Sequence, residues 1–91
     1  MKDNNSSIMI SAKKSVNILN VLFYINRASE EYLNGEHWEK YIITLNAYCS
    51  FYELSNDSKK RQEYALKALK ESEKHLDKTN HLRLQPIRFL I

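Results

Sequence analysis

The stretch from Asn34 to Leu54 is NGEHWEKYIITLNAYCSFYEL, and it decides the fold. Apolar residues recur there every three or four positions, which is the period of an α-helix. One apolar stripe holds Trp38, Tyr41, Leu45, Tyr48 and Tyr52, joined by Ile42 and Cys49, and a second holds Ile43, Ala47, Phe51 and Leu54. Two stripes predict a central helix, over residues 36–54, that lies between two neighbours.

Turn signals stand on both sides of this helix. Asn34-Gly35 predicts the end of a first helix over residues 11–33, because Gly and Asn tolerate the left-handed conformation of a C-terminal cap. The polar cluster Ser55–Ser58 predicts a loop and the N-terminal cap of a third helix over 57–79. The narrow apolar stripe of that helix is Ala65, Ala68, Leu69, Ser72 and Leu76. The sequence therefore predicts an all-α fold of three antiparallel helices.

Length and composition agree with this fold. The 91 residues make one helical domain, 1–91, with a frayed start at 1–7, and one glycine and one proline leave little material for hairpin turns. Hydrophobic residues make up 43% and charged residues 27%, which excludes a low-complexity tail. A single cysteine cannot form an internal disulfide, so we expect a reducing, cytoplasmic location.

The first helix is apolar over more than half of its circumference. Lys13 and Lys14 before Val16–Ile25 have the layout of a signal peptide, but Asn17 and Asn20 interrupt the apolar run. We interpret the run as a core helix, and no segment is long and apolar enough to cross a membrane. This helix either lies in the middle of its own bundle or pairs with another chain.

The C-terminal residues 81–91 form an apolar tail. Pro86 either opens a short fourth helix or ends the third. The chain then finishes on Phe89, Leu90 and Ile91, which we expect to pack on the bundle, on a partner or in a membrane interface.

The sequence predicts no enzyme, because no group of residues has the spacing that catalysis or ligand binding needs. His37, His75 and His81 share no metal-ligand spacing. Cys49 lies on an apolar stripe with no base nearby in sequence, and no glycine-rich loop could hold a phosphate. We therefore expect no catalytic residue, no metal site and no cofactor.

Two segments resemble known helical families. Asn34–Ile42 resembles the turn and second-helix start of a tetratricopeptide repeat, and Glu63–Asp77 resembles the closing helix of such a repeat, with Ala65 at the small-residue position. A weaker similarity, to the late helices of 14-3-3 proteins, rests on His37, Leu45, Asn46, Tyr52, Glu53, Leu54 and Asn56 and continues through Ala65, Ala68, Leu76 and Asp77. That family's basic phosphate-binding cluster has no counterpart here. Both resemblances imply stacked antiparallel helical hairpins used for protein binding.

The leading functional hypothesis is a small protein-interaction module, an adaptor or inhibitor. Its partner is another protein or a second copy of the chain, as a homodimer or other homo-oligomer, bound through helix one and the tail. The candidate partner-binding residues are Ile18, Leu22, Ile25, Leu84, Ile87, Phe89 and Ile91. The alternative is binding of nucleic acid or an anionic membrane, because residues 57–91 carry nine Lys and Arg against five Asp and Glu.

Overall fold

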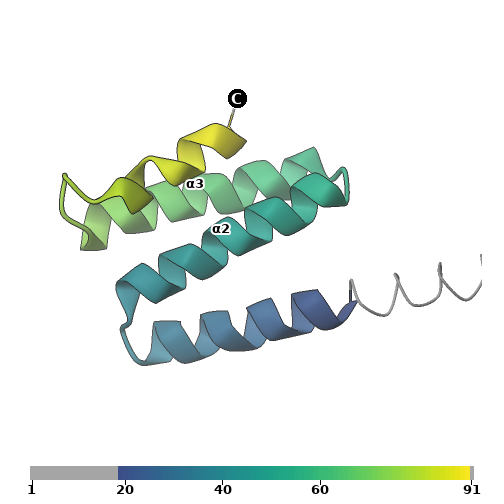
Figure 1. Ribbon diagram of the computed structural model, residues 1–91, viewed down its shortest axis with the longest axis horizontal. Helices are drawn as coiled ribbons and strands as arrows, with labels where there is room; N and C mark the ends of the chain where they lie inside the picture. The colour runs from purple at the N-terminus through teal and green to yellow at the C-terminus, as the bar shows by residue number, and fades with distance from the viewer. Residues whose placement is uncertain (1–18, 91) are drawn as a thin grey trace, which may run out of the picture.

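A computed structural model describes residues 19–90 of the chain as three helices and a short tail. The first helix covers residues 19–34 of the described part, α2 covers Trp38–Leu54 and α3 covers Ser58–His75. The tail holds two short 3₁₀ helices, η1 at His81–Arg83 and η2 at Gln85–Phe89. Successive helices run antiparallel, with α2 next to both the first helix and α3 (Figure 1). The predicted all-α fold is confirmed, and residues 19–90 contain no strand.

The prediction for residues 1–7, the predicted start of the first helix at residue 11, and the candidate residues Ile18 and Ile91 lie outside the described residues. Within residues 19–34, Arg27 Nε lies 3.5 Å from Glu31 Oε1 on the exposed side of the helix.

The two turns between helices are built alike. In the first, the His37 amide donates to the Tyr32 carbonyl and the Glu36 amide to the Leu33 carbonyl. In the second, the Asp57 amide donates to the Tyr52 carbonyl over the same five-residue separation. Each is a Schellman motif, which satisfies the last carbonyls of the preceding helix and reverses the chain.

The prediction that Gly35 takes the left-handed conformation is wrong. Glu36 takes it instead, with φ 57°, and Asn56 has the same φ in the second turn. Gly35 has a different role: a Cβ there would lie 2.7 Å from Cδ2 of the His37 ring, so a larger residue would displace this exposed side chain. The glycine therefore makes room for a side chain rather than for an unusual backbone.

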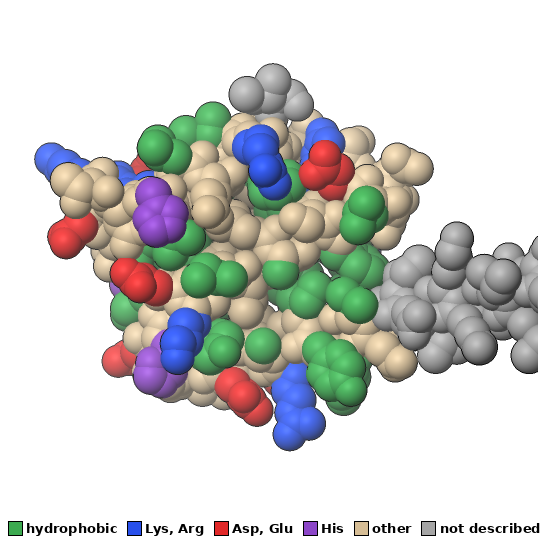
Figure 2. Space-filling model, in the orientation of Figure 1, with side chains coloured by type: hydrophobic (Ala, Val, Ile, Leu, Met, Phe, Trp, Pro, Cys, Tyr) green, Lys and Arg blue, Asp and Glu red, His purple; other side chains and the backbone are tan. Residues whose placement is uncertain are grey.

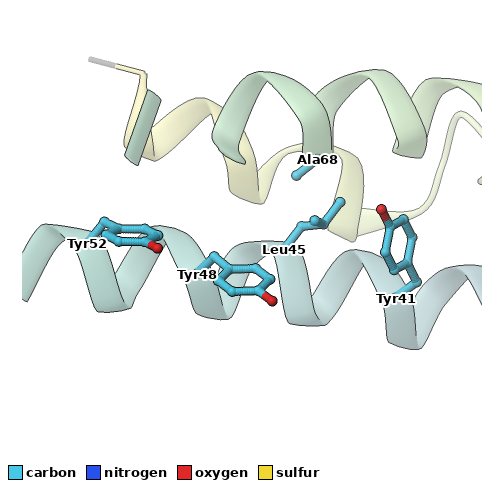
Figure 3. Close-up of a cluster of buried hydrophobic side chains, with 5 residues drawn as sticks. All are labelled: Tyr41, Leu45, Tyr48, Tyr52 and Ala68. Atoms are coloured by element: carbon cyan, nitrogen blue, oxygen red, sulfur yellow. The ribbon is translucent and has the colours of Figure 1, made fainter. Parts of the chain in front are cut away.

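The core lies on one side of α2 and is made largely of tyrosines. Its buried cluster is Tyr41, Leu45, Tyr48, Tyr52 and Ala68 (Figure 3). Leu45 of α2 and Ala68 of α3 point toward each other, so the small residue on α3 lets the two helices approach closely (Figure 3). The ring centroids of Tyr48 and Tyr64 are 4.3 Å apart, which joins the two helices by aromatic stacking.

The first helix completes this core from the other side. Leu22, Ile25 and Tyr32 pack against the tyrosine cluster. Tyr48 also donates a hydrogen bond to Asn26 Oδ1. Because the first stripe of α2 contacts both the first helix and α3, Ile43 and Leu54 of the second stripe stay exposed.

Helix α3 ends four residues earlier than predicted. Leu76 has an extended backbone, with φ −110° and ψ 150°, and the chain turns away toward the tail. Asn80 holds that turn, since its side chain accepts from the Leu82 amide and donates to Glu39 Oε1 of α2 at 2.9 Å. Pro86 lies in the first turn of η2, as expected of a short fourth helix.

Candidate interaction surface

The two described candidate residues on helix one point inward. Leu22 and Ile25 are half-buried and contact the tyrosine core, so they stabilise the described chain itself. The large apolar side chains that this helix exposes are different ones, namely Leu19, Val21, Phe23, Tyr24 and Leu33. Contact with a partner through helix one would therefore involve these exposed neighbours.

The tail residues divide into an anchor and an exposed pair. Phe89 is only 4% exposed and packs with Cys49 and Ala65, so it cannot touch a partner while the tail stays in place. Leu84 is 69% exposed and Ile87 is 43% exposed. Phe89 thus holds the tail on α2 and α3, and Leu84 and Ile87 are the tail residues presented outward.

Sequence reasoning assigned the second stripe of α2, Ile43, Ala47, Phe51 and Leu54, to a neighbour within the fold. Phe51 does pack against the tyrosine cluster, but among the described residues nothing buries Ile43 and Leu54. Ile43 is 50% exposed and Leu54 is 86% exposed, and Ser50 on the same face is exposed as well. In Figure 2, hydrophobic side chains lie across the middle of this side of the molecule, over α2. We call Ile43, Ala47, Ser50 and Leu54 the outer face of α2.

The signal for this face was present in the sequence. The gaps between its four residues are four, three and four, the spacing of the contact line between two packed helices. The sequence alone could not show that the third helix would use only the inner stripe.

A groove of about 360 Å³ lies between the outer face and η2. Its lining residues are Ile43, Asn46, Ala47, Ser50, Gln85, Arg88 and Phe89. Asn46 is only 8% exposed because the tail passes over it. Its Nδ2 donates to Gln85 Oε1 at 3.1 Å, while its Oδ1 is buried and has no hydrogen-bond partner among residues 19–90. A buried carbonyl oxygen without a donor costs free energy.

The groove has a positive side. Arg88 lines it, and no Asp or Glu follows Asp77 in the chain. On α2 the exposed Glu53 stands three residues beyond Ser50 and one before Leu54. The outer face therefore has a cation near its middle and an anion near one end.

Cys49 is fully buried and its thiol donates toward the Arg61 carbonyl at 3.6 Å. Burial raises the pKa of this thiol to about 11, so it stays protonated and poorly nucleophilic. His75 stacks on Trp38 with ring centroids 3.6 Å apart, and its Nε2 lies 3.3 Å from Glu71 Oε2. These contacts close the end of the α2–α3 pair and form no reactive group.

Within residues 19–90 no cluster of three His, Cys, Asp or Glu side chains could hold a metal ion. No helix in the described part of the chain has both the length and the apolarity to cross a bilayer.

No protein-family model matches the chain, and neither a curated protein nor a solved structure matches it at a significant level. The tetratricopeptide-like and 14-3-3-like resemblances stay predictions.

Proposed function

We propose that the protein is a small helical protein-interaction module, whose partner is another protein or a second copy of itself. The observation that carries this proposal is the outer face of α2 beside the groove: Ile43 is 50% exposed and lines the groove, and Leu54 is 86% exposed at the other end of the face. Large apolar side chains exposed along one face of a helix are typical of a binding surface.

The exposed tail residues extend this surface. Leu84 and Ile87 project from a segment that Phe89 anchors to the core, so they are held in place for a partner. An ordered surface binds at a lower entropic cost than a loose tail does.

The alternative, an anionic membrane or nucleic acid, draws support from the same tail. Lys78, Arg83 and Arg88 flank the exposed Leu84 and Ile87 in the sequence, although Glu73 of α3 lines the same hollow as Lys78 and Arg83. Basic residues beside exposed apolar side chains are typical of segments that lie on anionic bilayers. The stacked tyrosines Tyr48 and Tyr52 are buried, which removes them as a platform for bases.

The test is cross-linking and affinity capture from the native source, with wild-type protein and the double variant Ile43→Ser with Leu54→Ser. Leu66→Ser is the matched control, because Leu66 is exposed on α3 and does not line the groove. The proposal expects capture that survives about 0.5 M salt and nuclease treatment, and that is lost only in the double variant. Capture that vanishes at this salt concentration with every variant would favour the phosphate-binding alternative instead.

A further inference from the structure

We infer that the outer face of α2 binds the same face of a second copy of this chain, with the two α2 helices antiparallel. This inference rests on the proposed interaction function and names its partner. It comes from three features of the described residues: the spacing of the face, its small central residues and the charges beside it.

The spacing of the outer face is the same in both directions. Ile43 is four residues before Ala47, and Leu54 is four residues after Ser50. An antiparallel copy centred between Ala47 and Ser50 therefore places Ile43 against Leu54 of the partner subunit at both ends. A twofold interface needs this self-complementarity, because one patch must bind itself.

The centre of the face is small. Ala47 and Ser50 carry the least bulk on this side of α2, whereas the large side chains Ile43 and Leu54 stand at its ends. Small residues at the centre let two helices approach closely, and the large end residues then fill the space on either side.

Charges beside the outer face favour the same arrangement. Asn46 and Glu53 are seven residues apart, so they lie on the same side of α2. In an antiparallel pair, that side of one copy adjoins the same side of the other copy. Arg88 lines the groove at Asn46, so Glu53 of the partner subunit comes toward Arg88. The twofold axis makes this pairing occur twice, and such rim charges fix the orientation of the helices more than they add affinity.

The interface is small, which sets the conditions of the experiment. The four residues of the outer face and two ion pairs bury less than the roughly 800 Å² per partner of a standard interface. We therefore expect the dimer to dissociate on dilution in the micromolar range. The measurement is sedimentation of the full chain from about 10 to about 1000 µM, chosen to bracket that range.

The decisive variants reverse one charge each. Glu53→Arg and Arg88→Glu each place like charges together in a homodimer, and each is expected to weaken self-association on the order of 10-fold or more. An equal mixture of the two variants restores both ion pairs, so the mixture should sediment as a dimer. Leu66→Arg is the control for added charge, and circular dichroism checks that each variant keeps its helices.

Recovery of the dimer in the mixture supports this pairing. A wild-type chain that stays monomeric at about 1000 µM would overturn this pairing. A dimer that forms equally well with either charge reversal, but not with Phe23→Arg on the first helix, would also overturn it. A different outcome separates this inference from the proposed function. If the wild type is monomeric but captures a protein from the native source, and the double variant Ile43→Ser with Leu54→Ser fails to capture it, then the second copy is the wrong partner and the proposed interaction function stands.

Discussion

Truncating the tail anchor, Phe89→Ala, should release the tail and uncover Cys49. Phe89 is almost fully buried and packs directly on Cys49 and Ala65. A buried phenylalanine removes on the order of 200 Å² from water, and about 25 cal/mol per Å² gives roughly 5 kcal/mol as an upper limit. Comparable truncations cost about 3–5 kcal/mol.

The tail consists of two short 3₁₀ helices, so this loss should appear as local opening and not as global unfolding. The assay is the labelling rate of Cys49 with a thiol reagent in native buffer. A loss of about 3 kcal/mol in tail docking corresponds to roughly a 100-fold faster reaction, because each 1.4 kcal/mol changes the opening equilibrium about tenfold. Leu84→Ala, at an exposed tail position, should change the rate little. A helical Phe89→Ala chain with an unchanged labelling rate would refute the assignment of Phe89 as the cover of Cys49.

Three further predictions follow from the turns and the titratable groups. Glu36→Gly should raise the free energy of unfolding by about 0.5–1 kcal/mol in a thermal melt, because it relieves a left-handed φ. Asn56→Gly should raise the free energy of unfolding by less, because Asn tolerates the left-handed region. Equal increases in the two variants would contradict this reasoning. Burial raises the pKa of Cys49 to about 11 from an ordinary 9.0, so the buried thiol contributes stability that is complete below pH 9 and is lost as pH rises toward 11. In denaturant titrations, Cys49→Ala should lack this alkaline loss of stability. If the wild type and Cys49→Ala lose stability equally at alkaline pH, the buried thiol is not the cause. His75→Ala should uncover the Trp38 ring and move its fluorescence emission maximum to longer wavelength; an unchanged emission maximum would contradict the stacked arrangement.

The sequence was sufficient for the helices and for the inner stripe of α2, because a 3.6-residue period with Tyr41, Leu45 and Tyr48 on one side fixes which side is buried. It was not sufficient for the outer stripe. Periodicity indicates that Ile43 and Leu54 share a face, but only the packing of the described residues shows that nothing in residues 19–90 covers these two side chains.

Local turn chemistry was misjudged for a similar reason. Composition points to Gly35 as the left-handed residue, yet the His37 ring occupies the space where its Cβ would be, and the reversal falls on Glu36. The burial of Asn46 likewise depends on Gln85, which is 39 residues away in the chain. Contacts over such separations cannot be read from spacing along one helix.

The most direct test of the interaction surface is a dilution series of two-dimensional amide NMR spectra on the wild-type chain. Chemical shifts that depend on concentration should cluster at Ile43, Ala47, Ser50 and Leu54 and extend to Arg88, because self-association changes the surroundings of these residues. The first helix should stay constant at Phe23. Spectra that do not change between about 10 and about 1000 µM, or changes confined to the first helix, would contradict the assignment of the outer face of α2 as the site where two copies meet.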